Sequence, residues 1–334
     1  MTTPKIDLVY MWVDGDDKEW LETKNYWLKK IKNEAPVRHD SAVSARWRDN
    51  DELKYSLRSA EKFAPWINHI YLVTGFGQVP KWLNTKNKKI TVISHEQIMP
   101  ADALPTFNSV AIEMCLMNIP NLSEHFLLAN DDMFFNKPVS PEYFYDKHDR
   151  AIIWYSKNRN FPAIGYGMEM VCSDYKQTIL VAANKIVSIF GKKYRKYVTY
   201  APAHNIDPYF KSTMLNTRNH PLLSHDIDIQ IRNKFRTNWE LQRWIFNLYD
   251  IVHGKAVFKR ARHFKKSKHF IYNLVHYYEC KNAPTYCEDA ENRLLHVSPP
   301  LFCINDTDRT SDETRKKNHR FLEEKFPNKS SFEI

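Results

Sequence analysis

The order of apolar runs and amphipathic segments along the 334 residues predicts an α/β fold with a mostly parallel central sheet. Over roughly the first 155 residues, short apolar runs rich in β-branched side chains alternate with segments of helical periodicity. This alternation is typical of parallel strands joined by crossover helices. The second half is mainly helical in pattern, without an internal repeat or a low-complexity linker. We therefore expect one continuous unit over 1–334, with an α/β half (1–155) and a mainly helical half (156–334).

The strands are predicted from apolar runs that end at turn-forming residues. The first run, 6–13, ends at Asp14 and Gly15, and the run 69–74 ends just before Gly75. Three further runs of the same kind complete the prediction of strands: 90–94, 125–129 and 152–155.

The helices are predicted from apolar residues at helical spacing. In 49–63, for example, Leu53, Leu57 and Ala60 share one face, and Asn50 or Asp51 is a suitable cap. The other predicted helices are 20–32, 107–117, 175–190, 208–215, 239–252 and 311–326.

Composition excludes several classes of protein. With only seven glycines the chain has neither a P-loop nor a dinucleotide-binding Gly motif, so side chains, a helix N-terminus or a metal must hold any phosphate. Five cysteines without a C-x-x-C pair argue against a disulfide framework and a structural zinc site. No apolar run approaches the roughly 18 residues that span a bilayer, and the polar start does not resemble a signal peptide. We expect a cytoplasmic protein.

The net charge of +10 favours anionic partners. Basic residues concentrate in 192–196 and in 259–268. These runs are either solvated faces or contacts with an anionic polymer or membrane surface, and the sequence favours neither. A contact at the inner face of the plasma membrane would be peripheral. The basic runs lack the interleaved aromatic pattern of RNA-binding proteins, so we expect no nucleic-acid partner.

Acidic clusters follow two of the predicted strands. Asp14, Asp16 and Asp17 follow the first strand, and Asn130, Asp131 and Asp132 follow 125–129. Ligands of open α/β sheets bind at the carboxyl ends of the strands. Two carboxylates and an amide suit Mg²⁺ or Mn²⁺, which bind through one or two carboxylates together with substrate phosphates. For an isolated Asn-Asp-Asp, a simple Asx turn is the other interpretation.

Two further stretches carry charged or titratable candidates. Residues 46–58 hold Arg46, Asp49 and Arg58, which either bind phosphate or form ordinary helix-surface pairs. His204 lies in a proline-containing loop before Asp207, a place where histidine is a candidate general base.

Taken together, the motifs of this chain resemble those of the Stealth family. Residues 6–17 (IDLVYMWVDGDD) resemble its first conserved region. The segments 46–58, 64–74, 79–83, 104–109 and 130–134 resemble its second region. Residues 201–207 (APAHNID) resemble the third, and 303–306 (CIND) with 326–333 (FPNKSSFE) resemble the fourth. The likeness covers nearly the whole chain in order. It implies a Rossmann-like nucleotide-sugar transferase core and an activity like that of bacterial capsule and cell-wall polysaccharide phosphotransferases.

The resemblance also implies roles for individual residues. Those implied to bind the donor are Trp12, Val13, Asp14, Gly15, Arg46, Asp49, Arg58 and Asn130. Those implied to bind the metal are Asp131, Asp132, Asn305 and Asp306. The implied catalytic residues are His204 or Asp132 as the base, with Arg236 holding phosphate charge. The family often has Asn in place of Asp14.

The expected reaction transfers a sugar-1-phosphate from a UDP-sugar to a hydroxyl of an oligosaccharide or lipid-linked saccharide, releases UMP and leaves a phosphodiester. Phosphoryl transfer of this kind depends on positioning and on neutralising phosphate charge. The alternative is a metal-dependent glycosyltransferase, which would attack the sugar carbon and release UDP. The sequence names neither the sugar nor the acceptor.

Overall fold

The computed structural model describes residues 4–32, 47–157, 174–203, 205–237, 239–260, 271–273, 294, 298–304, 306 and 310–334. Its main sheet has five strands in the order β3-β2-β1-β4-β8. Their bounds are β1 Ile6–Met11, β2 Ile70–Thr74, β3 Ile90–Ser94, β4 His125–Asn130 and β8 Asp207–Phe210. The first four run parallel, and β8 pairs antiparallel with β4 at one edge. The prediction of a mostly parallel sheet is confirmed.

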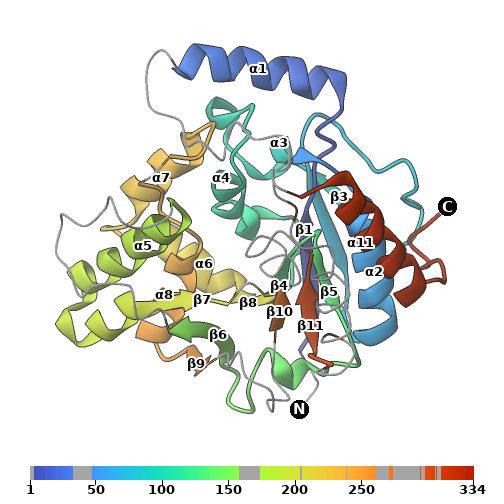
Figure 1. The fold of residues 1–334 in the computed structure, drawn as a ribbon. Helices are drawn as coiled ribbons and strands as arrows, with labels where there is room; N and C mark the ends of the chain where they lie inside the picture. The colour runs from blue at the N-terminus through green and yellow to red at the C-terminus, as the bar shows by residue number, and fades with distance from the viewer. Residues whose placement is uncertain are drawn as a thin grey trace.

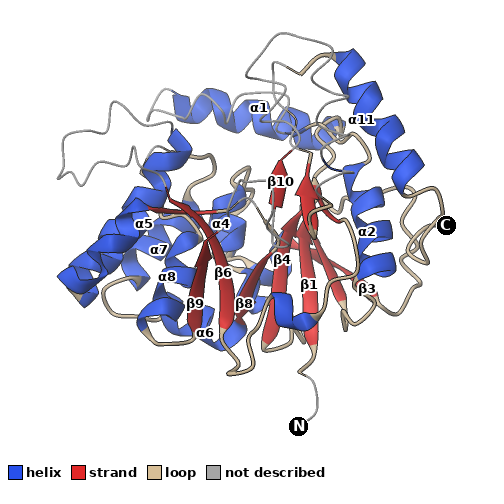
Figure 2. Ribbon diagram, turned by 60° about the horizontal axis from the view of Figure 1, so that its bottom comes forward, coloured by secondary structure: helices blue, strands red, loops and turns tan. Residues whose placement is uncertain are grey.

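Two smaller three-stranded sheets accompany the main one. The first contains β10 Ile271–Asn273, β11 Leu301–Cys303 and β5 Met133–Phe135. The second contains β7 Tyr200–Pro202, β6 Ala151–Lys157 and β9 Ala256–Arg260, and it lies beside β8 (Figure 2). The predicted strand 152–155 therefore exists as β6 but belongs to the second small sheet. An apolar run of this length does not specify its partner strand.

Helices flank the sheets on both sides (Figure 1). Their bounds are α1 Lys18–Lys32, α2 Glu52–Phe63, α3 His95–Ile98, α4 Ser109–Glu113, α5 Asp174–Phe190, α6 Lys211–Arg218, α7 Ser224–Arg232, α8 Trp244–Val252 and α11 Asp312–Lys325. Short 3₁₀ segments cover Ala101–Ala103, Leu116–Asn118, Pro141–Tyr143 and Lys192–Thr199. Among the described residues, no helix combines the length and apolarity needed to cross a bilayer.

Several predicted helices have different bounds. The prediction 208–215 was wrong for its first residues, since 207–210 form β8 and α6 begins only at Lys211. The prediction 107–117 resolves into α4 and a 3₁₀ turn, with the Asn108 side chain capping α4 by accepting from the Val110 N–H. Helix α7 was missed. Among the described residues of the second half, helices are the main element as expected, but these residues also supply β8 to the main sheet and β7, β9, β10 and β11 to the smaller sheets.

Helix α2 links the main sheet to the C-terminal segment. Its Ser56 hydroxyl donates to the Met133 carbonyl at 2.5 Å, and the Phe135 N–H donates to the Ser59 hydroxyl at 3.0 Å. Helix α11 covers this region, because its Phe321 and Leu322 pack in one buried cluster with Tyr55 of α2 (Figure 1). The N-terminal end of α2 is thereby held beside the carboxyl ends of the central strands.

Candidate active site

The turns after β1 and β4 lie next to each other. The two strands are parallel neighbours, and their last residues, Met11 and Asn130, are partners in the register. Parallel strands present their carboxyl ends at one edge of a sheet. The structure therefore brings the predicted segments 12–15 and 130–132 together, as expected.

The C-terminal segment contacts the acidic pair Asp131 and Asp132. Strand β11 pairs antiparallel with β5, which follows the pair directly. The Ile304 N–H donates to the Asp132 carbonyl at 2.9 Å, and the Cys303 thiol donates to Asp132 Oδ2 at 3.3 Å. Asp132 Oδ1 is buried, and among the residues that the structure describes it has no hydrogen-bond partner. Such an orphaned oxygen is costly to leave unpaired, so it is suited to a ligand that supplies the missing partner.

The charges of three other carboxyl groups act on Asp131. Burial raises the pKa of Asp131 well above its usual range, and the charges of Asp132, Glu52 and Asp49 raise it further. Burial also raises the pKa of Glu52 to about 7, although hydrogen bonds from Asn50 oppose this. The pKa of Asp49 is raised by burial as well. A buried carboxylate surrounded by negative charge attracts a cation, which relieves both the repulsion and the desolvation.

The turn after β1 is held rigidly. A Cβ on Gly15 would lie 2.0 Å from the Trp47 carbonyl oxygen, so only glycine fits this close approach. Gln78 brackets Asp14, since it accepts from the Asp14 N–H at 2.9 Å and donates to its carbonyl at 3.0 Å. The Asp14 carboxylate accepts from the Asp16 N–H within the turn. The contact of the Asp14 carboxylate thus lies within its own turn.

Trp12 ties this turn to the segment before α2. Its indole N–H donates to Asp49 Oδ2 at 3.2 Å, and Asp49 Oδ1 accepts from the Asp51 N–H at 2.9 Å. Val13 packs at the edge of a cluster of buried aromatic rings that includes Trp20 and Phe107. These contacts place the predicted residues Trp12, Val13 and Asp49 beside the acidic pair.

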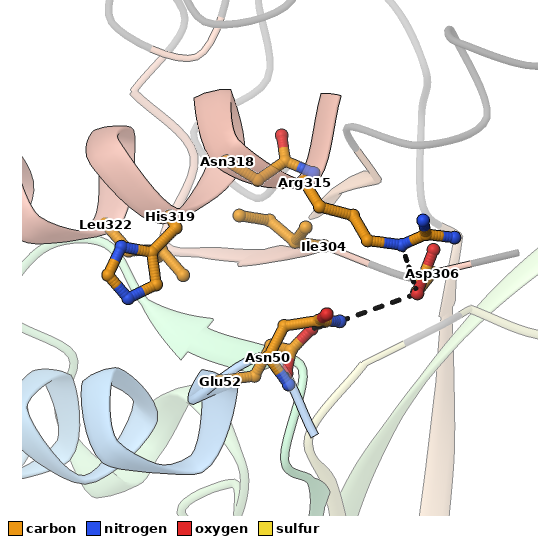
Figure 3. A pocket seen from close by; sticks show the side chains of 8 residues that line it. All are labelled: Asn50, Glu52, Ile304, Asp306, Arg315, Asn318, His319 and Leu322. Atoms are coloured by element: carbon orange, nitrogen blue, oxygen red, sulfur yellow. Dashed lines mark hydrogen bonds and ion pairs between the residues drawn. The ribbon is translucent and has the colours of Figure 1, made fainter. Parts of the chain in front are cut away.

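A small pocket opens between the start of α2 and α11 (Figure 3). Asn50 and Glu52 line one side, and Arg315 and His319 of α11 line the other. Glu52 belongs both to this pocket and to the group of acids around Asp131. The pocket therefore adjoins the acidic pair.

Asp306 closes one end of the pocket between two arginines. Its Oδ2 accepts from Arg48 Nη1 at 2.9 Å and from Arg315 Nε at 3.0 Å. Burial alone would raise the pKa of Asp306, but the hydrogen bonds from Arg315 and Arg48 outweigh it and lower the pKa. This oxygen is engaged by guanidinium groups, so these contacts do not support Asp306 as a metal ligand.

Comparison with known proteins identifies the family. The family models "Stealth protein CR1, conserved region 1" and "Stealth protein CR2, conserved region 2" match residues 4–32 and 46–153. The capsular polysaccharide phosphotransferase WcwK of Streptococcus pneumoniae is 30% identical over 350 residues, covering 98% of this chain and 98% of WcwK. The chain belongs to the Stealth family.

Other proteins are similar over different shares of the chain. The exopolysaccharide phosphotransferase cps2G of Lactiplantibacillus plantarum is 48% identical over 142 residues, which are 42% of this chain and 40% of that protein. Among solved structures, the galactosyltransferase LgtC with donor and acceptor sugar analogues matches at a TM-score of 0.43 and 11% identity, covering 97% of this chain and 96% of LgtC.

Arg58, which the Stealth resemblance implies as a donor-binding residue, instead forms hydrogen bonds with the C-terminal segment. Its Nε and Nη2 donate to the two carboxylate oxygens of Glu333 at 2.8 and 2.6 Å, and its Nη1 donates to the Phe326 carbonyl at 2.7 Å. It lies six residues along α2 from Glu52, about 9 Å at 1.5 Å per residue. The expectation that Arg58 binds the donor is therefore not supported.

Arg236 and Asn130 are described, whereas three predicted residues are not. Arg236 donates to the Ser109 hydroxyl at the start of α4. Asn130 ends β4 next to the acidic pair. Arg46, His204 and Asn305 lie outside the described residues. Their expected roles in this Stealth protein stay predictions.

The residues present at the acidic pair fit a divalent cation. Within the described residues, Asp131 and Asp132 form no ion pair with a cation, Asp132 Oδ1 lacks a partner, and burial raises the pKa of Asp131. Mg²⁺ commonly binds through one or two carboxylates plus substrate phosphates. In the described part of the chain, no group of three or more His, Cys, Asp and Glu side chains converges in a metal-binding arrangement. The pair alone is thus the candidate site.

Sequence reasoning missed two residues of the site, Glu52 and Arg315, and one buried polar residue elsewhere, Asn205. Glu52 is only 7% exposed, but nothing in the sequence distinguishes it from its acidic neighbours Asp49 and Asp51. Arg315 lies in a helix whose surface is rich in charge. Asn205 is 2% exposed, and within the described part of the chain neither of its side-chain polar atoms has a partner. Its place beside the candidate base His204, in the segment that resembles a third Stealth region, was the one available signal.

Proposed function

We propose that this chain transfers a sugar-1-phosphate from a UDP-sugar to a hydroxyl of an oligosaccharide or lipid-linked saccharide, in the synthesis of a bacterial capsular or cell-wall polysaccharide. Membership of the Stealth family supports this, as do relatives named capsular polysaccharide and exopolysaccharide phosphotransferases. The observation that carries the proposal is the acidic pair at the end of β4 with its orphaned oxygen, Asp132 Oδ1.

The proposed reaction breaks and forms bonds only at phosphorus. The acceptor oxygen bonds to the β-phosphorus of the donor while the bond from that phosphorus to the bridging oxygen breaks. UMP leaves with the bridging oxygen, and the acceptor hydroxyl gives up its proton to a base. The bond between sugar carbon and oxygen persists, so the anomeric configuration is retained.

The described residues serve this chemistry by position and charge. Asp131 and Asp132 would hold Mg²⁺ or Mn²⁺, which when bound neutralises negative charge on the diphosphate. Arg236 is the proposed contact for further phosphate charge. Asp132 and His204 are the two candidates for accepting the acceptor proton.

The turn after β1 would bind the nucleotide. Gly15 brings the main chain against Trp47, and Gln78 fixes Asp14 from the other side. A preformed turn of this kind binds without losing conformational entropy. Trp12 and Asp49 connect it to the acidic pair, so the diphosphate would extend from this turn toward Asp131.

The identity of the released nucleotide tests the proposal. The full chain is incubated with Mg²⁺, a panel of UDP-sugars and short oligosaccharide acceptors, and the nucleotides are separated by ion-exchange chromatography. We expect UMP, together with a phosphodiester resonance in the ³¹P NMR spectrum of the product. UDP would identify a glycosyltransferase instead, and free sugar phosphate would indicate hydrolysis.

A matched pair of variants assigns the activity to the acidic pair. We expect Asp132→Asn to abolish UMP formation. Asp226→Asn removes a carboxylate that pairs with Lys185 on α5, and we expect it to leave the rate unchanged. Equal rates in the two variants would refute the assignment.

A further inference from the structure

A basic surface with aromatic side chains lies on the second small sheet. It is formed by the 3₁₀ segment Lys192–Thr199 and the strands β7, β6 and β9, of which the three strands lie side by side in Figure 1. We call it the basic–aromatic surface. Its exposed cations are Lys192, Lys193, Arg195, Lys196 and Arg260, whereas Lys259 projects from the other face of β9 beside Trp154.

The segments of this surface carry no acidic side chains that would neutralise its positive charge. Residues 191–203 and 253–260 contain no Asp or Glu. Within the described residues, none of its cations takes part in an ion pair, whereas Arg218, Arg232 and Arg243 elsewhere are each paired with a carboxylate. Like charges held close together repel, so an anionic partner would be attracted here.

Half-buried aromatic rings lie among the cations of this surface. Tyr155 and Tyr200 stack at 4.0 Å and 15°, and Phe258 contacts both rings at 5.3 Å. The lysine ammonium groups lie against rings of the same surface, with Lys193 5.0 Å from the Tyr194 centroid and Lys196 5.1 Å from that of Tyr197. Flat rings beside cations suit a ligand that offers both sugar faces and negative charge.

The surface adjoins the proposed active site along the chain. Strand β7 ends at Pro202, and β8 begins at Asp207, which pairs with Leu128 two residues before the end of β4. Five steps of 3.8 Å separate Pro202 from Asp207, so at most about 19 Å of chain lies between them. A bound polymer can thus reach from the surface to the acidic pair.

We propose that the basic–aromatic surface binds the growing acceptor, a saccharide chain that carries phosphodiester charges. The proposal rests on the proposed function, whose product gains one negative charge with each transferred sugar phosphate. A lipid surface is less suitable, because the large apolar side chains that are exposed in the described residues lie on other parts of the molecule. These are Leu21, Tyr26, Val79, Leu222, Ile229, Trp239 and Ile334.

Binding of model polymers tests this surface without any requirement for activity. The probes are dextran phosphate, neutral dextran of equal length, and vesicles of phosphatidylglycerol and phosphatidylcholine. We expect the full chain to bind dextran phosphate more weakly as salt increases, and to bind neutral dextran far more weakly. Preference for the vesicles over dextran phosphate would overturn the proposal.

Two triple variants of equal charge locate the binding. Lys193→Ser, Lys196→Ser and Arg260→Ser together should weaken dextran phosphate binding at least about tenfold, since each basic residue near an anionic surface contributes several-fold. The control combines Lys81→Ser, Lys86→Ser and Lys88→Ser, exposed lysines around the loop before β3, and should bind like the unaltered protein. Equal losses in both would show that net charge alone is responsible.

Turnover separates this proposal from the proposed function. In the triple variant of the basic–aromatic surface, we expect an unchanged rate with a short neutral acceptor. With a phosphorylated acceptor, we expect a raised KM at constant kcat. An unaltered protein that forms no UMP but still prefers dextran phosphate would refute the proposed function while the binding surface stands.

Discussion

Two places along α2 are joined to the C-terminal segment through arginine and carboxylate, but in different ways. They are the middle of the helix at Arg58, which we call the far end, and the segment just before the helix at Arg48, which we call the near end. At the far end, Arg58 meets Glu333 with two nitrogens on two oxygens, and its third nitrogen reaches the Phe326 carbonyl. At the near end, one oxygen of Asp306 serves both Arg48 and Arg315. The far end is a closed pair, whereas the near end shares one acceptor between two cations.

The polar groups next to these two contacts also differ in whether they have hydrogen-bond partners. Beside the far contact, the Ser330 N–H and hydroxyl also donate to Glu333, which completes the carboxylate. Beside the near contact, Asp132 Oδ1 has no partner, and burial raises the pKa of Glu52 to about 7. Polar groups satisfied within the chain stabilise the fold, while buried groups that lack partners cost stability and are found where a ligand binds. The two ends therefore predict opposite effects of substitution.

The largest effect is expected for Asp132→Asn. This change keeps the shape and removes one charge from the acidic pair, so we expect transfer to fall by about 10²–10⁴-fold, the range for loss of a catalytic proton acceptor. Without metal, the free energy of unfolding should stay constant or increase, because repulsion with Asp131 disappears. Steady-state rates and urea denaturation measure the two quantities.

Mg²⁺ provides the control for Asp132→Asn. A ligand that binds only the folded state raises the melting temperature. We expect Mg²⁺ to stabilise the unaltered protein and to have little effect on the variant. A variant that loses both activity and stability would place Asp132 with the structural residues of the far end.

Arg58→Met should act through stability. The side chains of Arg58 and Glu333 are 12% and 3% exposed, and removing one partner leaves the other buried and unpaired. We expect the free energy of unfolding to fall by about 3 kcal/mol, with kcat unchanged in the folded fraction. A loss of kcat without a loss of stability would restore Arg58 to the donor site.

The stability difference between the unaltered protein and Arg58→Met should depend on pH. Burial would raise the pKa of Glu333, but the hydrogen bonds from Arg58 outweigh it and hold the pKa below its usual value. A lowered folded pKa contributes stability above the unfolded value of about 4.3, and this contribution disappears as the pH falls through the folded pKa. Urea denaturation at pH 7 and near pH 3 should show the difference shrinking in acid.

Asp306→Asn should have an intermediate effect. The asparagine oxygen still accepts one hydrogen bond but no longer neutralises Arg48 and Arg315, whose side chains are 32% and 16% exposed. We expect a loss of about 1–2 kcal/mol in the free energy of unfolding and a changed KM for the donor. Asp312→Asn is the control, since Asp312 also pairs with Arg315 but is 90% exposed. Equal effects in both would remove the distinction between the near end and ordinary surface pairs.

The sequence predicted the central strands well because they are apolar and buried on both faces. All five residues of β2 are buried, for example, so an uninterrupted apolar run sufficed to find it. The prediction from the sequence failed at β8, because Pro208 and the following residues suggested the start of a helix. A proline is tolerated there because β8 is the edge strand of the sheet.

The same limit applies to the site. Asp131 and Asp132 could be predicted, because a strand end fixes their place relative to the sheet. The roles of Arg48 and Arg58 could not, because both follow from contacts with residues more than 250 positions away. Arg58 was thus predicted to bind the donor and Arg48 was given no role, since only tertiary packing shows what each arginine contacts.

The smallest effect on stability is expected for Asn205→Ala. Asn205 is 2% exposed and both of its side-chain polar atoms lack partners, so the alanine variant loses no hydrogen bond. We expect the free energy of unfolding to change by less than about 1 kcal/mol, because relief of the unpaired amide offsets the small cavity. If the amide binds a substrate, the rate of transfer should nevertheless fall about tenfold, because this is the usual effect of losing one good hydrogen bond to a substrate.

Asn136→Ala is the matched control for Asn205→Ala. Asn136 is 8% exposed, and its amide nitrogen donates to the Pro299 carbonyl at 2.7 Å, so it differs from Asn205 in this bond, while among the described residues its Oδ1 has no partner either. Its loss should cost about 1–2 kcal/mol of stability and leave KM and kcat unchanged, as at the far end of α2. If Asn205→Ala instead destabilised the protein like Asn136→Ala and kept full activity, an unpaired buried amide would not mark a ligand contact here. The contrast between the two ends of α2 would then hold only for their charged groups.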